Sequence, residues 1–162
     1  TINLLPAKAG NVRLINPQSF GTSEHVRLAL TVTHLGVPII DGSASGISEC
    51  KPTRNSVTFG FYSPAHNLMV LCTGNGSFEQ MKETFVHETI HMVQDCRAGL
   101  ANSALRDQNG KFTEWQYARL SQKNKQNIHS LYSGKDQVYE VEARKLDHSP
   151  LIAWKYLVKH CR

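Results

Sequence analysis

Two histidines stand four positions apart in the segment His87-Glu88-Thr89-Ile90-His91. On an α-helix, side chains at positions i and i+4 lie on the same face, so both imidazoles can bind one metal ion. Glu88 directly follows the first histidine, where its carboxylate can take a proton from a water molecule at the metal. The sequence therefore predicts a Zn²⁺ site with His87 and His91 as ligands and Glu88 as the general base.

A catalytic zinc site needs a third protein ligand and keeps a fourth position open for water. Two acidic residues of a later predicted helix, Glu140 and Glu142, could supply that ligand. Ala143 is small and stands three positions after Glu140, so it would let this helix pack closely behind the zinc helix, which favours Glu140. Glu142 stays the alternative. On an ideal helix it points about 200° away from Glu140, so only one of the two can bind comfortably.

A third histidine would be a different kind of ligand. The HExxHxxGxxH class of zinc enzymes requires glycine at position 94 and histidine at position 97. The chain has Gln94 and Arg97 at these positions, which excludes that class. His129 and His148 remain as more distant candidates, either as ligands or as hydrogen-bond donors to the transition state.

Other residues are predicted to support the ligands or the reaction. Metal-bound histidines usually donate their second ring N–H to an oxygen, which makes Gln94 and Asp95 candidates for that contact. Tyr132 and Tyr139 are candidates for a hydrogen bond to the tetrahedral intermediate of peptide hydrolysis.

The HExxH segment lies inside a helix predicted over residues 77–96. Ser77 and Gln80 form the S-x-x-Q pattern of a capping box at its start. Apolar residues then recur at roughly helical spacing. They are Phe78, Met81, Phe85, Ile90 and Val93.

Shorter elements surround this helix. Two β-type runs, residues 57–62 and 67–72, precede it and are predicted to form a hairpin, whose second strand is expected to align a peptide substrate. A short strand is expected at 37–40, and further helices at 23–35, from 113, at 136–147 and from 150. A small antiparallel or mixed sheet followed mostly by helices predicts a single α+β, zincin-like domain over residues 1–162.

Composition narrows the function classes. The 162 residues carry a mild net charge of +5, and the densest basic stretch, residues 123–125, lacks the interleaved aromatic residues of a nucleic-acid groove. No apolar run is long enough for a membrane span, and the first residues lack the apolar segment of a secretory signal. The four cysteines form no CxxC pair, so either two disulfides in an oxidising compartment or extracellular particle, or buried thiols, are expected.

Residues on both sides of the zinc motif also follow a known pattern. They are Gly60, Pro64, Asn67, the Val-Leu-Cys of 70–72, Met81, Thr84 and the Asp-Cys-Arg-Ala of 95–98. In these residues the chain resembles, as a distant relative, the mitochondrial intermembrane-space zinc metallopeptidase family that matures an ATP-synthase subunit. In that family the segment with the third ligand follows the zinc helix more closely than here, where residues 101–135 intervene.

The resemblance has implications for the site. The family's third ligand is the glutamate of an E-x-x-A segment, which Glu140 and Ala143 match, so the resemblance implies His87, His91 and Glu140 as ligands. It implies that Glu88 is catalytic. Because family members work in an oxidising space, it also implies a disulfide between Cys72 and Cys96.

The sequence thus predicts a zinc metalloendopeptidase of the HExxH…E, gluzincin-like type that hydrolyses a polypeptide substrate. The alternative is a catalytically silent metallopeptidase fold that serves as a structural or binding component of a larger protein assembly. Zinc stoichiometry measured together with cleavage of an unstructured protein would separate the two.

Overall fold

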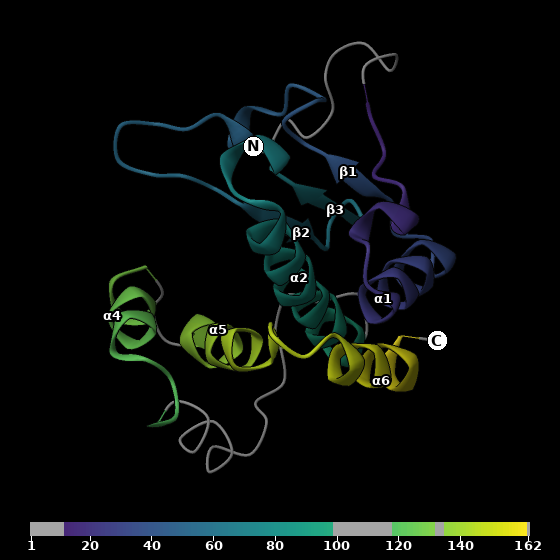
Figure 1. Ribbon diagram of the computed structural model, residues 1–162. Coiled ribbons are helices and arrows are strands. Elements are labelled where there is room, and N and C mark those ends of the chain that lie inside the picture. Colours follow the sequence, from purple (N-terminus) through teal and green to yellow (C-terminus); the bar gives the residue numbers. More distant parts are fainter. Residues whose placement is uncertain (1–11, 99–117, 132–134, 162) are drawn as a thin grey trace.

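The computed structural model describes residues 12–98, 118–131 and 135–161, and these form an α+β arrangement, as predicted. Within these residues lie five α-helices and a mixed sheet of three strands (Figure 1). The elements are η1 Pro17–Phe20, α1 Ser23–His34, β1 Ile39–Asp41, η2 Ser48–Cys50, β2 Gly60–Ser63, β3 Leu68–Leu71, η3 Thr73–Asn75, α2 Phe78–Ala98, α4 Gln122–Leu131, α5 Lys135–Leu146 and α6 Pro150–His160.

The sheet has the strand order β1-β3-β2. Strands β2 and β3 pair in antiparallel fashion, which confirms the predicted hairpin, and β1 pairs with β3 in parallel. All four residues of β3 are buried, as expected for a central strand. The prediction that the second hairpin strand aligns a substrate is wrong, because β3 has a neighbour on both sides. Among the described strands, β2 has a neighbour on one side only.

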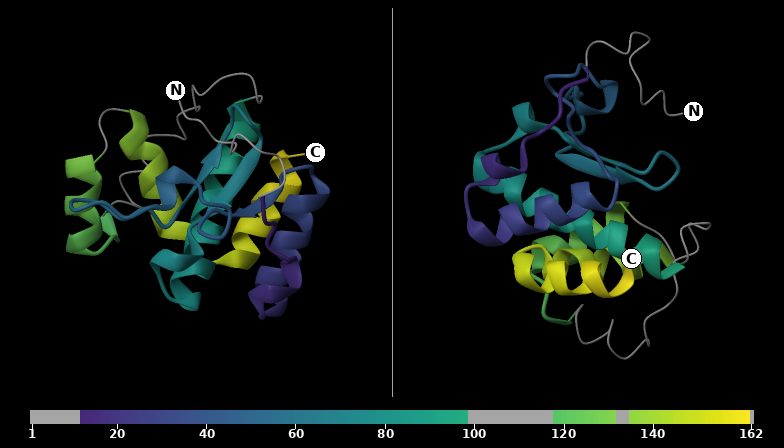
Figure 2. Two further views of the ribbon diagram at one scale, coloured as in Figure 1. Left: turned by 90° about the horizontal axis from the view of Figure 1, so that it is seen from above. Right: turned by 90° about the vertical axis from the view of Figure 1, so that its right-hand side faces the viewer.

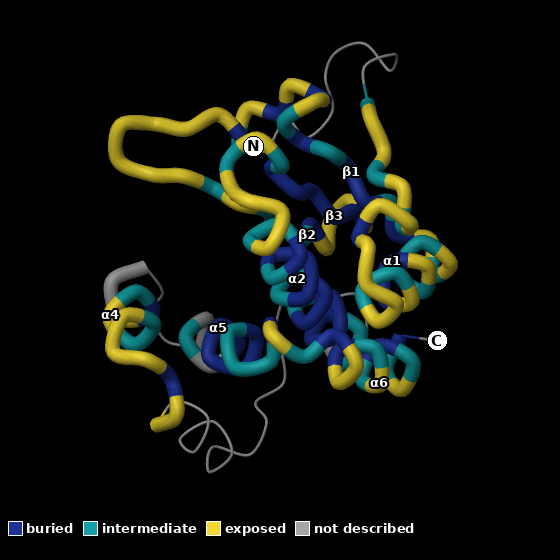
Figure 3. Tube along the Cα trace, viewed as in Figure 1, coloured by how far each residue is buried: buried dark blue, intermediate teal, exposed yellow. Residues whose placement is uncertain are grey.

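Helix α2 crosses the centre of the molecule, against β2 and β3 on one side and α5 and α6 on the other (Figure 1). Its predicted start is confirmed, since the amide of Gln80 donates to Ser77 Oγ at 3.1 Å. Phe85, Ile90 and Val93 are fully buried, and Figure 3 shows the buried segments gathered at α2 and β3. The main core therefore lies directly behind the HExxH segment.

Helix α6 holds α1 against α2. The indole Nε1 of Trp154 donates to Thr31 Oγ1 at 3.1 Å, which joins α6 to α1. The predicted start of α6 at Pro150 is confirmed. Helix α1 begins at Ser23, as predicted, and the Thr22 side chain caps it by accepting a hydrogen bond from the His25 amide.

Helix α5 carries Glu140, the predicted third ligand. It matches the predicted helix at 136–147 to within one residue at each end. Beside it, at the margin of the molecule, lies α4, which includes the basic stretch at 123–125 (Figure 2). The predicted helix start at Thr113 lies outside the described residues. No helix in the described part of the chain is both long and apolar enough to span a membrane.

Two disulfides link the chain, Cys50–Cys72 and Cys96–Cys161. The expected Cys72–Cys96 pair is wrong, because these two residues lie toward opposite ends of α2. From Phe78 to Cys96 the helix alone rises about 27 Å. Cys72 instead packs in a small cluster with Cys50, and Cys161 belongs to the main core against which Cys96 packs. Two disulfides fit an oxidising setting.

Candidate metal centre

Two imidazoles from α2 and one carboxylate from α5 meet at a single point. The Nε2 atoms of His87 and His91 are 3.2 Å apart. Glu140 spans the pair, with Oε1 at 3.0 Å from His87 Nε2 and Oε2 at 3.1 Å from His91 Nε2. The structure thus brings together all three predicted ligand residues, although Glu140 stands 53 positions after His87 and 49 positions after His91.

The outer nitrogens of both imidazoles also face oxygen atoms. Nδ1 of His91 lies 2.8 Å from Oε1 of Gln94, where the sequence predicts a supporting oxygen. Nδ1 of His87 lies 3.5 Å from Oδ2 of Asp147. When Nδ1 carries the hydrogen and donates it outward, the lone pair of Nε2 points inward. Two nitrogen lone pairs and a carboxylate then face one another, an arrangement that a cation bound between them would stabilise.

The electrostatics of the three groups agree with this geometry. Burial alone would lower the pKa of His87, but its contacts with Asp147 and Glu140 outweigh burial and raise that pKa to about 10. Burial would likewise raise the pKa of Glu140, but hydrogen bonds from His87 and His91 hold it well below its usual range. Glu140 is therefore ionised, and the two imidazoles lie where positive charge is favoured.

Glu88 lies beside this cluster and is held by the sheet. Its Oε2 accepts a hydrogen bond from the backbone N–H of Tyr62, at 3.0 Å. Burial raises the pKa of Glu88, and the charges of His91 and His87 partly oppose that rise. A carboxylate with a raised pKa is better suited to accept a proton near neutral pH than an exposed one.

Gly60 permits the close approach of β2 to α2 on which this contact depends. A Cβ at this position would lie 2.7 Å from the backbone oxygen of Val70 and 2.8 Å from Cγ2 of Thr84. Thr84 precedes Glu88 by one helical turn, so both side chains face β2 from the same side of α2. A side chain at position 60 would push β2 outward, away from Glu88.

Replacing Gly60 with alanine is expected to lower the free energy of unfolding by about 1–3 kcal/mol, because the added methyl group must displace backbone. Urea unfolding of the two proteins measures the difference. The control is Gly74→Ala, since the nearest atoms there are Ser43 Oγ at 3.2 Å and Ser43 Cβ at 3.3 Å, so a smaller shift than at Gly60 makes room for the methyl group. Equal losses in both variants would contradict the packing argument.

The alternative ligand Glu142 lies on another side of α5. Its Oε1 accepts hydrogen bonds from Gln94 Nε2, at 3.0 Å, and from Arg97 Nη2, at 3.2 Å. Gln94 Nε2 also donates to the backbone oxygen of Tyr139, at 3.0 Å. Gln94 therefore touches His91 through one end of its amide and joins α2 to α5 through the other. Glu142 therefore helps to join α2 to α5 and does not contact the imidazoles in the hydrogen bonds described for it.

The remaining predicted residues take different places. Asp95 accepts a hydrogen bond from the Tyr62 hydroxyl at 3.1 Å, so the prediction that it supports an imidazole is wrong, because its carboxylate is turned toward β2. Tyr139 is buried on α5 and His129 is exposed on α4. His148 is exposed next to Asp147. Tyr132 lies outside the described residues.

No protein family, curated protein or solved structure matches the chain. The donor atoms of the site must therefore indicate which ligand they suit. Two imidazole nitrogens and one carboxylate are the ligands that zinc takes in catalytic sites, with one position left for water. Calcium and magnesium would take oxygen ligands instead. The residues present thus fit zinc.

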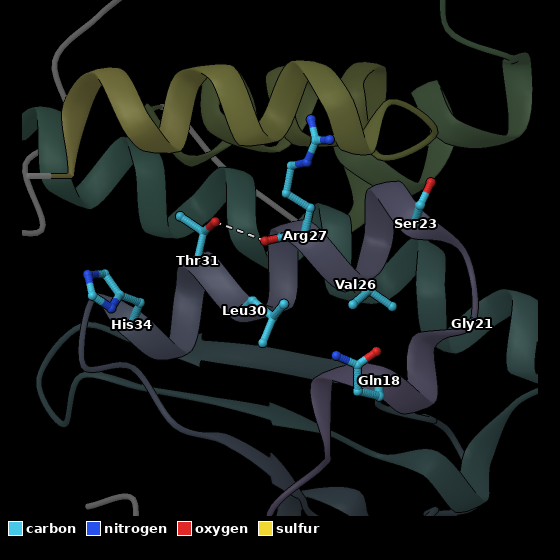
Figure 4. A pocket seen from close by; sticks show the side chains of 8 residues that line it. All are labelled: Gln18, Gly21, Ser23, Val26, Arg27, Leu30, Thr31 and His34. Atoms are coloured by element: carbon cyan, nitrogen blue, oxygen red, sulfur yellow. Dashed lines mark hydrogen bonds between the residues drawn. The ribbon is translucent and has the colours of Figure 1, made fainter.

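An open groove elsewhere on the molecule has few side chains that could take part in a reaction. It runs along α1 and shares no residue with the His87, His91 and Glu140 cluster (Figure 4). Its titratable side chains are Arg27 and His34, and the rest of its lining is aliphatic or neutral polar. A groove of this composition gives no indication of a reaction.

Three residues that contact the site were not predicted. Arg144 stands four positions after Glu140, and its Nε donates to Glu140 Oε1 at 3.0 Å. The helical period thus places Arg144 on the face of Glu140. Asp147 stands seven positions after Glu140 and directly follows the end of α5. Tyr62 has no comparable signal, because its contact with Glu88 depends on how β2 packs against α2.

Proposed function

We propose that the chain is a zinc-dependent metallopeptidase of the HExxH…E, gluzincin-like type, with a zincin-like fold. The observation that carries the proposal is the meeting of His87 Nε2, His91 Nε2 and the Glu140 carboxylate at 3.0–3.2 Å. Membership of the ATP-synthase-processing metallopeptidase family is part of the proposal, supported by the matching residues between Gly60 and Ala98.

Each residue of the site has its own role in the proposed reaction. Zinc, when bound by His87, His91 and Glu140, would supply the Lewis acidity that polarises the scissile carbonyl and lowers the pKa of water. Glu88 takes the proton from the attacking water and delivers it to the leaving amine. The N–H of Tyr62 holds Glu88 in place for both transfers.

The edge of β2 that no described strand covers is the proposed place for the substrate. The amide of Cys72 donates to the backbone oxygen of Phe59, so alternate residues of β2, Gly60 and Tyr62, turn their backbone groups away from β3. An extended peptide can add to such an edge as a further strand, pairing with Gly60 and the Tyr62 carbonyl, since the Tyr62 N–H already donates to Glu88. Because the N–H of Tyr62 contacts Glu88, a peptide on this edge would pass beside the proposed base. The proposed substrate is therefore a polypeptide segment in extended conformation.

Replacing Glu140 with glutamine is expected to remove stoichiometric zinc, because a neutral amide is a poor substitute for the carboxylate between two imidazoles. The purified wild-type chain should contain one zinc ion per molecule. Metal analysis by mass spectrometry measures the content. The matched control is Glu142→Gln, two positions away on the same helix, which should keep zinc because Glu142 contacts Gln94 and Arg97 instead.

Two outcomes would count against the proposal. Unchanged zinc in Glu140→Gln, with zinc lost in Glu142→Gln, would exchange the roles of the two carboxylates. A wild-type chain that holds zinc but does not cleave an unstructured protein such as casein would instead favour the alternative of a silent structural component.

A further inference from the structure

A second group of metal-binding side chains lies directly behind the first. One ligand atom each from Glu83, Asp147 and His148 lies within 4.8 Å of the others. His148 stands between the carboxylates, with Nδ1 at 3.7 Å from Glu83 Oε2 and Nε2 at 3.3 Å from Asp147 Oδ1. Glu83 precedes His87 by one turn of α2, and the other two residues follow the end of α5. The second group thus comes from α2 and from the two residues that directly follow α5.

One carboxylate oxygen of the second group is buried without a hydrogen bond. The side chain of Asp147 is 9% exposed. Its Oδ1 accepts no hydrogen bond from the described residues, although Nε2 of His148 lies 3.3 Å away. A buried carboxylate oxygen that has lost its water requires a compensating partner. A cation bound beside Glu83 and His148 would be such a partner.

The second group is open to solvent on its outer side. The side chains of His148 and Glu83 are 74% and 39% exposed, so an ion can enter without disturbing the core. Two carboxylates and one imidazole suit zinc and similar divalent transition metals, with water completing the coordination. Three ligands on an open surface bind more weakly than the enclosed first site.

We propose that Glu83, Asp147 and His148 bind a second, weaker zinc ion, and that this ion inhibits the metallopeptidase. The inhibition rests on the proposed function, whereas the binding does not. Asp147 couples the two sites, because its Oδ2 lies 3.5 Å from His87 Nδ1 while its Oδ1 faces the second group. A cation on Oδ1 withdraws negative charge from the support of His87. Loss of such support typically costs 10–100-fold in metal affinity or activity.

Zinc binding by equilibrium dialysis over a wide range of free zinc tests the proposal. The wild-type chain should bind two ions per molecule, one tightly and one weakly, and hydrolysis of casein should fall by roughly 10-fold or more as the weak site fills. His148→Ala should bind only the tight ion and resist inhibition. Because His148 is exposed, this variant should fold, and Glu83→Gln is a second variant with the same expected result.

The control His34→Ala removes an exposed histidine from α1, far from the group in sequence, and should keep both ions. One ion in the wild type at the highest zinc concentration would overturn the proposal, as would a weak ion that survives in His148→Ala or disappears equally in His34→Ala. His91→Ala separates the two proposals, since it should lose the tight ion only. If no tight ion exists and the weak one still depends on His148, the metallopeptidase proposal fails and the second site stands.

Discussion

Replacing Glu88 with glutamine is expected to slow peptide hydrolysis by about 10²–10⁴-fold, the usual contribution of a general base, while zinc stays bound. Glutamine has nearly the shape of glutamate and keeps an oxygen that can accept the hydrogen bond from the Tyr62 N–H. It cannot take a proton from water. The measurement is kcat for cleavage of casein, with zinc content and urea unfolding recorded on the same preparation.

A matched control lies on the same helix. Glu79 is 80% exposed and pairs only with Lys82 among the contacts described for it, so Glu79→Gln should leave both kcat and zinc unchanged. Activity of Glu88→Gln close to that of the wild type would exclude the proposed base. Loss of zinc in this variant would show that Glu88 supports the metal rather than the proton transfer.

Removing the disulfide between Cys96 and Cys161 by a double substitution to alanine is expected to lower the free energy of unfolding by about 4 kcal/mol. The two cysteines are 65 positions apart, and the entropic benefit of a cross-link increases with the length of chain that it closes. The closed segment includes α5, so Glu140 should also be held less firmly against His87 and His91. Urea unfolding measures the first effect, and competition with a chelator measures the second.

The second disulfide provides the comparison. Cys50 and Cys72 are 22 positions apart and enclose none of the three proposed ligands. Their double substitution to alanine should cost about 3 kcal/mol of stability and leave zinc affinity nearly unchanged. Equal losses of zinc affinity in both double variants would contradict the assigned role of the Cys96–Cys161 link.

The elements that the sequence predicts well are those with local signals. Ser77 and Gln80 mark the start of α2, Pro150 marks the start of α6, and the break between the two β-type runs marks the hairpin. The sequence did not predict the strand order, because the parallel pairing of β1 with β3 joins residues far apart in the chain. This pairing makes β3 central and leaves β2 at the edge, which the hairpin pattern alone could not indicate.

The residues of the candidate site also differ in how far the sequence alone predicts them. His87 and His91 follow from helical spacing, and the small Ala143, fully buried in the structure, favoured Glu140 over Glu142. The cysteine pairing could not be predicted, since four cysteines allow three connectivities and only packing selects one. The contact between Tyr62 and Glu88 depends on the approach of β2 to α2, which no local pattern encodes.

The Cys96–Cys161 link also makes the segment between its cysteines a covalent ring, with Glu140 inside it and His87 and His91 before it. A peptide bond cut once anywhere in that ring leaves both pieces joined through sulfur. A preparation cut once within this ring would therefore migrate as a single band on a gel without reductant and would separate into two fragments only after thiol treatment.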